Sequence, residues 1–303
     1  MTTDANAADA ETDSDARSEA DSNAEPETDG GTDSNAGSSS TGETVTGTVS
    51  LVGSGPGDPE LLTVKAKRLL EDADVVLHDK LPGPEIIDTL PDDRREDVGK
   101  RAGGERTPQS EINERLVELA REGKDVVRLK GGDSFVFGRG GEEAEYLAER
   151  GVPFEVVPGV TSAIAAPAVA GVPVTHRDHA SSVSFVTGHE DPTKDDSAVD
   201  WDALAATGGT IVVLMGVGRL PDYTAALLEA GTAPETPVAL IERGTWPGQR
   251  VATGTLETIV DVRDEEEISP PAVTVIGDVA ATRETVVEFI ENDYETPATG
   301  AEE

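Results

Sequence analysis

No cysteine occurs in this chain, so it can form neither disulfide bonds nor cysteine-ligated zinc or iron–sulfur centres. Histidine is also scarce, and two of the four residues, His176 and His179, enclose an Arg-Asp pair. Two histidines with one nearby aspartate are too few ligands to indicate a metal site, and no metal is expected.

Basic residues are few as well: 24 Lys and Arg stand against 61 Asp and Glu, for a net charge of −37. Because phosphate contacts need clustered Lys and Arg, nucleic-acid binding is disfavoured. Only seven of the basic residues are lysine, and aromatics make up 3% of the chain. Self-repulsion of this size is tolerated when salt screens it, since the Debye length falls to about 3 Å at 1 M salt. The composition indicates a halophilic, haloarchaeal protein, with an ordinary acidic protein as the alternative.

Apolar residues larger than alanine are almost missing from the start of the chain. Residues 1–46 hold twelve acidic residues and one basic residue, Arg17, so they carry −11 and the rest of the chain carries −26. Such a segment cannot bury enough apolar surface to offset its ordering entropy, which predicts a disordered acidic tail. It has no apolar stretch typical of a secretory signal, and nothing after it predicts a membrane span, so we expect a cytoplasmic protein. Residues 292–303 form a second, polar tail that we expect to be frayed.

Between these tails, strand-like and helix-like segments alternate. Strands are predicted at Val49–Val52, Val75–Leu77, Val126–Leu129, Phe154–Val157, Ser182–Thr187, Ile211–Met215, Val238–Ile241 and Val273–Ile276. Helices are predicted at Leu61–Leu70, Ser110–Arg121, Glu142–Arg150, Ser162–Val169 and Asp222–Glu229. The alternation up to Val169 predicts an α/β fold with a parallel sheet covered by helices, and the strands from Ser182 onward form a second set. Turns near residues 158–175 divide it into two α/β lobes, residues 47–160 and 161–291, and the cleft between lobes is the expected ligand site.

A glycine-rich turn follows the first strand. Gly53, Gly55 and Gly57 have the spacing G-x-G-x-G, which differs from the G-x-G-x-x-G of dinucleotide-binding folds. Pro56 removes a backbone donor, and Asp58 places a carboxylate where a pyrophosphate would lie. The turn therefore favours a ligand that is not strongly anionic, although a plain tight turn is an equal alternative.

The stretch L-K-G-G-D-S-F-V-F-G-R-G-G-E-E, residues 129–143, is the most unusual in the chain. Gly131 and Gly132 allow a ligand to approach the backbone closely, Asp133 offers a carboxylate, and Arg139 is flanked by glycines. The alternative is a long structural turn. Asp79 follows a predicted strand, at the carboxyl end where α/β sheets place ligands, but a lone aspartate there is more often a cap or a surface acid.

Arginine and lysine gather locally in this acidic chain. The cluster comprises Arg94, Arg95, Lys100, Arg101 and Arg106, which either bind a polyanionic small molecule or belong to a solvated loop.

Together, these stretches resemble the tetrapyrrole methylase family, in its uroporphyrinogen-methylating branch. The resemblance runs from about Gly47 to about Ile290 and rests on several long motifs in the right order. They are V-G-S-G-P-G-D-P-E-L-L-T, V-G-K-R-A-G, V-V-R-L-K-G-G-D-S-F-V-F-G-R-G-G-E-E, V-V-P-G-V-T-S, G-V-P-V-T-H-R and S-P-P-A-V-T-V-I-G.

The resemblance implies two α/β lobes with S-adenosylmethionine bound between them, usually in a homodimer. The implied activity is that of a uroporphyrinogen-III C-methyltransferase, which methylates uroporphyrinogen III at C2 and C7 to give precorrin-2 for sirohaem or cobalamin. The implied cofactor contacts are Pro56, Gly131, Gly132, Asp133, Val136, Thr161, Ser162, Met215, Gly244 and Ala272. The resemblance makes Asp79 the proton acceptor and Lys100 the proton donor. It makes Arg139, Arg177 and Arg101 ligands of the substrate carboxylates.

The chain departs from the family pattern in three places: Lys80 stands where Arg is expected, Leu77-His78 where an aromatic often precedes the aspartate, and Ser134 where proline is usual. Another corrin-pathway methylase or a diphthine synthase-like enzyme would keep the fold and change the substrate. A nicotinamide-linked oxidoreductase and a non-catalytic tetrapyrrole carrier are alternatives from other classes, and the glycine spacing counts against the first of them.

Overall fold

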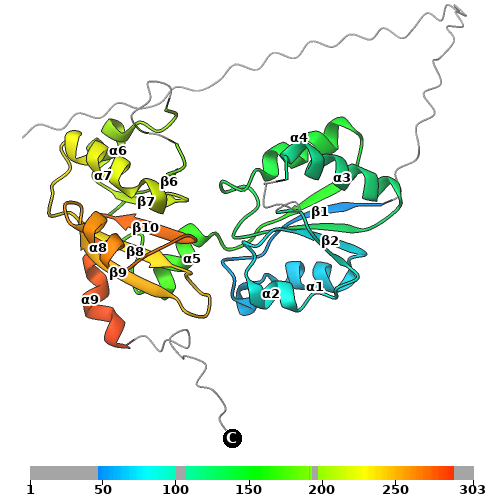
Figure 1. Ribbon diagram of the computed structural model, residues 1–303, viewed down its shortest axis with the longest axis horizontal. Helices are drawn as coiled ribbons and strands as arrows, with labels where there is room; N and C mark the ends of the chain where they lie inside the picture. Colours follow the sequence, from blue (N-terminus) through cyan, green and yellow to red (C-terminus); the bar gives the residue numbers. More distant parts are fainter. Residues whose placement is uncertain (1–46, 100–106, 191, 193–196, 290–303) are drawn as a thin grey trace, which may run out of the picture. The chain divides into compact units, whose positions relative to one another are not determined.

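The computed structural model describes residues 47–99, 107–190, 192 and 197–289. Within these residues the chain forms two five-stranded sheets, the first from residues 49–157 and the second from residues 183–276 (Figure 1). This architecture confirms the predicted α/β fold with two sheets. A division of the chain into lobes at residue 160 remains a prediction.

The first sheet is wholly parallel, with the strand order β3-β2-β4-β1-β5. Its strands are β1 Val49–Gly53, β2 Val75–His78, β3 Arg95–Asp97, β4 Val126–Lys130 and β5 Phe154–Val157. Every residue of β1 and β4 is buried, as expected for central strands that helices cover on both faces. Because parallel strands end at the same edge, the loops after β1, β4 and β5 leave the sheet together.

Helices cover both faces of this sheet (Figure 1). On one face lie α3 Gln109–Arg121 and α4 Gly140–Glu149, with Leu116 and Leu147 in the core against Leu51. On the other lie α1 Val64–Asp72 and α2 Pro84–Asp88. Two side chains cap the helices here: the Asp58 side chain caps the short 3-10 helix Pro59–Leu61, and Thr63, the N-cap of α1, accepts a hydrogen bond from the Ala66 amide at 3.1 Å.

The second sheet is mixed, with the order β6-β7-β10-β8-β9. Its strands are β6 Val183–Thr187, β7 Thr210–Leu214, β8 Pro237–Glu242, β9 Arg250–Thr255 and β10 Ala272–Ile276. Only β6 and β7 pair in parallel, and the other neighbours are antiparallel. Alternate residues of each strand therefore enter different cores, as Val213 and Val212 do.

The helices of the second sheet divide between its two faces. The helices α6 Trp201–Thr207, α7 Leu220–Glu229 and α8 Ile259–Glu265 share the core that contains Val213. The helix α5 Ser162–Val169 and the 3-10 helix Asp278–Thr282 share the core that contains Val212. The short helices α9 Arg283–Val286 and Val287–Phe289 follow. No helix within the described ranges is both long and apolar enough to cross a membrane.

Candidate functional site

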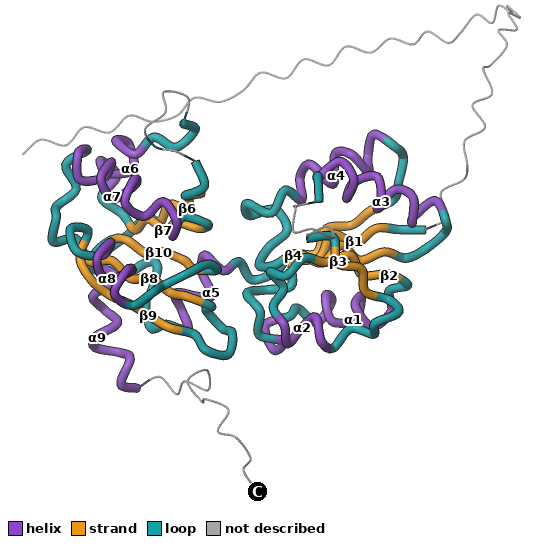
Figure 2. The backbone as a smooth tube through the Cα atoms, viewed as in Figure 1, coloured by secondary structure: helices purple, strands orange, loops and turns teal. Residues whose placement is uncertain are grey.

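The loops after β1, β4 and β5 meet through glycines. Gly55 and Gly132 exchange two backbone hydrogen bonds, of 3.0 and 2.7 Å, so the loops after β1 and β4 form a small bridge. Figure 2 draws the strands of the sheet in orange and the loops that join them to other elements in teal. A Cβ atom on Gly53 would lie 2.6 Å from the carbonyl oxygen of Gly132 and 2.6 Å from the amide nitrogen of Gly159. Only glycine permits this approach, so the three loops are built as one unit at the carboxyl edge of the sheet.

Asp133 ties this unit together. Its Oδ1 accepts hydrogen bonds from the amides of Phe135 at 2.8 Å and Val136 at 3.3 Å, and its Oδ2 accepts one from the amide of Gly159 at 3.0 Å. Both oxygens are therefore occupied by backbone donors of this chain. Any contribution of Asp133 to cofactor binding acts through the shape of the loop as well as through its charge.

The beginning of α5 lies against the same unit. Thr161 is the N-cap and accepts a hydrogen bond from the Ala163 amide at 3.3 Å. A Cβ on Gly132, where φ is +69°, would be 3.5 Å from the Ser162 amide nitrogen and 3.9 Å from its hydroxyl oxygen. The structure thus brings Gly132, Thr161 and Ser162 together, which are three of the residues predicted to contact a cofactor.

Three further predicted residues lie at one edge of the second sheet. Leu214, the last residue of β7, pairs with Val273, and Glu242, the last residue of β8, pairs with Ala272, the first residue of the antiparallel β10. Met215, Gly244 and Ala272 therefore lie on the same side of the sheet, at the carboxyl ends of β7 and β8. Met215 has a positive φ of 57° and is 56% exposed, which is unusual for an apolar side chain. Gly244 packs against Ala166 of α5 so closely that a side chain there would clash.

Trp246 makes a contact with the first glycine-rich loop that the sequence patterns do not predict. Its indole Nε1 donates a 2.7 Å hydrogen bond to the carbonyl oxygen of Pro56, 190 residues earlier in the chain. The ring fills the space beside Gly57, where a Cβ would clash with the indole, and lies 3.4 Å from a Cβ built on Gly83. The carbonyl oxygen of Pro56 therefore accepts its hydrogen bond from a residue that follows β8. The only hint in the sequence is that Trp246 is one of two tryptophans and stands among turn residues.

A buried charge cluster lies behind Asp79. Glu143 of α4 is fully buried, and its Oε1 accepts hydrogen bonds from Arg128 Nε at 3.1 Å, Lys130 Nζ at 3.0 Å and Gln109 Nε2 at 3.0 Å. Arg128 Nη2 lies 3.8 Å from Asp79 Oδ2. Burial lowers the pKa of the Lys130 amine, and the nearby Arg128 lowers it further, while Glu143 and Asp79 act in the opposite direction. The cluster was also missed from sequence, where Glu143 reads as a surface acid in the first turn of a helix.

Asp79 itself is partly exposed, with 27% of its side chain accessible, at the end of β2. Its Oδ1 accepts a hydrogen bond from the Leu81 amide at 2.8 Å. A Cβ on Gly99 would lie 3.1 Å from the Asp79 Cβ, so the chain passes Asp79 immediately before Lys100. Lys100 and Arg101 lie outside the described residues.

The predicted substrate arginines differ in their surroundings. Arg139 is engaged with Glu142 by hydrogen bonds of 2.9 and 2.6 Å, on an exposed surface. Arg177 is exposed and has no ion pair with any residue in the described ranges. Arg94 and Arg95 of the local basic cluster make contacts within the fold. Arg94 donates hydrogen bonds to the carbonyl oxygens of Glu71 and Ala73. Arg95 forms ion pairs with Asp88 and Asp92.

This arrangement suits a ligand with a polar, largely uncharged body. The loops present backbone groups and glycines, and the second sheet adds the exposed Met215 and the small residues Gly244 and Ala272. Ser134 adds a fully buried hydroxyl that has no hydrogen-bond partner in the described part of the chain. An adenosyl group with a sulfonium fits these residues, because it needs close backbone contacts and an apolar wall and requires no phosphate cradle.

Comparison with known proteins gives consistent matches. Residues 48–260 match the family model of tetrapyrrole (corrin/porphyrin) methylases. An S-adenosyl-L-methionine-dependent uroporphyrinogen III methyltransferase from Methanosarcina barkeri is 57% identical over 234 residues, which cover 77% of this chain and 92% of that protein. A siroheme synthase from Pseudomonas aeruginosa is 50% identical over 246 residues, which cover 80% of this chain and 52% of that protein. This chain therefore spans about half the length of the siroheme synthases.

Among solved structures, uroporphyrin-III C-methyltransferase from Thermus thermophilus in complex with S-adenosylhomocysteine matches with a TM-score of 0.66 and 42% identity. The match covers 77% of this chain and 98% of that chain.

Proposed function

The chain belongs to the tetrapyrrole methylase family, and from this premise we propose that it is an S-adenosylmethionine-dependent uroporphyrinogen III C-methyltransferase. The observation that carries the proposal is the 57% identity to the Methanosarcina barkeri uroporphyrinogen III methyltransferase over 92% of that protein. The joined loops after β1, β4 and β5 support it, because they suit an adenosyl ligand and depart from a dinucleotide-binding turn.

When bound, S-adenosylmethionine supplies a methyl group carried on a positively charged sulfur. The residues of this chain then have to orient it toward a pyrrole carbon of the macrocycle and exclude water. The interlocked loops at Gly55, Gly132 and Gly159 are suited to this, since hydrogen bonds and close backbone contacts within the chain hold them together. Positioning of this kind can supply most of the acceleration of an in-line displacement.

A proton has to leave the macrocycle, because the methyl group arrives as a cation and the macrocycle returns to its original charge. Asp79 is the proposed acceptor and Lys100 the proposed donor. The 27% accessible side chain of Asp79 leaves a carboxylate oxygen open to a ligand, and Arg128 Nη2 lies 3.8 Å from its Oδ2. Arg139, Arg177 and Arg101 are proposed to bind the acetate and propionate arms.

The finer assignments belong to the same proposal. Methylation occurs at C2 and C7 and yields precorrin-2 for sirohaem or cobalamin synthesis. The protein works as a homodimer. It works in a salt-rich cytoplasm, and its charge of −37 supports this second assignment.

Calorimetry separates this function from nicotinamide chemistry. We expect S-adenosylhomocysteine to bind and NADH to give no heat of binding. Release of S-adenosylhomocysteine from S-adenosylmethionine should then require uroporphyrinogen III. Binding of NADH without S-adenosylhomocysteine would contradict the proposal, and so would cofactor turnover that is unaffected by uroporphyrinogen III.

A further inference from the structure

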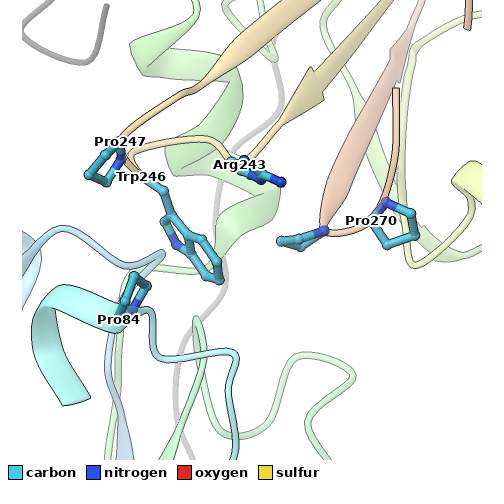
Figure 3. A pocket seen from close by; sticks show the side chains of 6 residues that line it. Pro84, Arg243, Trp246, Pro247 and Pro270 are labelled. Carbon is cyan, nitrogen blue, oxygen red and sulfur yellow. The ribbon is translucent and has the colours of Figure 1, made fainter. Parts of the chain in front are cut away.

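A cavity of about 340 Å³ opens beside the Trp246–Pro56 contact. Its wall is formed by Pro84, Arg243, Trp246, Pro247, Pro270 and Pro271. Figure 3 shows Arg243 and Trp246 projecting from the same turn, with Pro84 next to the indole and Pro270 on the opposite side. The wall thus combines four prolines and one aromatic ring with a single charged group, the Arg243 guanidinium.

The turn that presents Arg243 is strained and firmly held. It joins β8 to β9, and two of its residues other than glycine have a positive φ: Arg243 at 51° and Thr245 at 73°. The Arg243 amide donates to the Pro271 carbonyl oxygen at 2.9 Å, and the Thr245 amide donates to Gln249 Oε1 at 2.9 Å. Such conformations persist only where the surroundings impose them, and they concentrate at ligand sites.

The Arg243 guanidinium has no counter-ion within the described residues. Its neighbour in the hairpin, Arg250, pairs with the buried Glu242, whose other oxygen accepts a hydrogen bond from Ser269 at 2.7 Å. In a chain with 61 acidic residues, no acid lines this cavity. Arg243 is exposed, as are Pro84, Pro247 and Pro270 of the wall, so the guanidinium is accessible to an anionic group that enters from solvent.

The cavity adjoins three of the proposed cofactor contacts. Gly244 follows Arg243, Ala272 follows Pro271, and Trp246 is hydrogen-bonded to Pro56. We propose that Arg243 is a carboxylate-binding residue for a ligand of the reaction. This inference rests on the proposed function, whose two ligands both carry carboxylates: one on the methionyl part of the cofactor and several on the arms of the tetrapyrrole. A planar guanidinium binds a carboxylate in a two-point geometry that lysine cannot reproduce.

The test uses the full-length protein and the variants Arg243→Gln and Arg243→Lys. Calorimetry with S-adenosylhomocysteine alone measures cofactor affinity, and the KM for uroporphyrinogen III is measured at saturating S-adenosylmethionine. We expect Arg243→Gln to raise either the dissociation constant of S-adenosylhomocysteine or the KM for uroporphyrinogen III by about ten- to a hundredfold, as for the loss of a hydrogen bond to a charged group. The same constant, measured for Arg243→Lys, should lie between the values for Arg243→Gln and the unsubstituted protein. The exposed Arg121→Gln, which removes the same charge far from the cavity, should change neither constant.

The two measurements distinguish the source of the carboxylate. A rise in the dissociation constant of S-adenosylhomocysteine assigns the site to the cofactor, and a rise confined to the KM for uroporphyrinogen III assigns it to a tetrapyrrole arm. If Arg243→Gln folds with an unchanged melting temperature and leaves both constants within about twofold, the inference is wrong while the proposed function stands. An equal effect of Arg121→Gln would also overturn it. An unsubstituted protein that binds neither ligand would overturn the proposed function itself.

Discussion

Replacing Glu143 by glutamine should destabilise the protein strongly, because it removes the carboxylate that two buried cations share. Arg128 and Lys130 are 3% and 5% exposed, and both bond to Glu143 Oε1, at 3.1 and 3.0 Å. Glutamine keeps the volume and one acceptor oxygen but removes the charge. Removing one partner of a buried ion pair costs about 3–5 kcal/mol, and we expect Glu143→Gln to lower the free energy of unfolding at pH 7 by this amount.

The cost should depend on pH, because Lys130 can release its proton. The pKa of folded Lys130 is already lowered by burial and by Arg128, so between that pKa and the unfolded value of about 10.4 the unfolded chain binds more protons. Stability from this group therefore rises with pH across that window. Glu143 raises the pKa of folded Lys130, which is the lower end of this window. In Glu143→Gln that pKa therefore moves further down, toward neutral pH. The difference between the variant and the unsubstituted protein should shrink as the pH approaches 10.

Urea unfolding in molar KCl at pH 7 and at pH 9.5 measures both effects. The matched control is Glu142→Gln, one residue earlier, whose partner Arg139 is half exposed. Exposed pairs contribute little, so this control should change stability by less than about 1 kcal/mol. If Glu143→Gln costs no more than Glu142→Gln, or if its cost grows as the pH rises, the account of the buried cluster is wrong.

Three further results are expected. Trp246→Phe keeps the ring but removes the hydrogen bond to Pro56, so the dissociation constant of S-adenosylhomocysteine, measured by calorimetry, should rise by about two- to tenfold; an unchanged constant would mean that the contact does not hold the loop. Asp133→Ala should lower both cofactor affinity and melting temperature, because three backbone amides lose their acceptor, whereas Arg139→Ala should mainly raise the KM for uroporphyrinogen III; unchanged binding in both variants would reduce this loop to a plain turn. The melting temperature should climb from low salt to molar KCl, with activity retained, because salt near 1 M shortens the Debye length from about 10 Å to about 3 Å; a flat melting temperature would refute the halophilic assignment.

The buried strands of the first sheet were the easiest elements to predict. Central parallel strands are apolar throughout, and the segment that became β4 was recognised to within one residue. The strands β3 and β9 were not predicted. Both lie at sheet edges, where a strand can form from a charged or glycine-interrupted sequence such as R-E-D or R-V-A-T-G-T, which lacks a strand-like apolar pattern. The short helices α2, α6 and α8 were missed as well, since fewer than eight residues carry little periodicity.

The candidate site was predictable only where backbone geometry dictates residue type. The glycine loops were recognisable because close approach of two chains demands glycine, as at Gly53 and Gly132. Trp246 was not, because its partner lies 190 residues away and is a carbonyl group with no sequence signature. The burial of Glu143 was equally hidden, since it depends on two cations that extend from a neighbouring strand.

The most direct test of the central claim is the mass of the tetrapyrrole product. The purified protein would be incubated anaerobically in molar KCl with uroporphyrinogen III and an excess of S-adenosylmethionine that carries a deuterated methyl group. The account predicts a product that has gained two labelled methyl groups, attached to carbon, with no gain when the cofactor is omitted. A macrocycle recovered without label, from protein shown to bind both ligands, would contradict it.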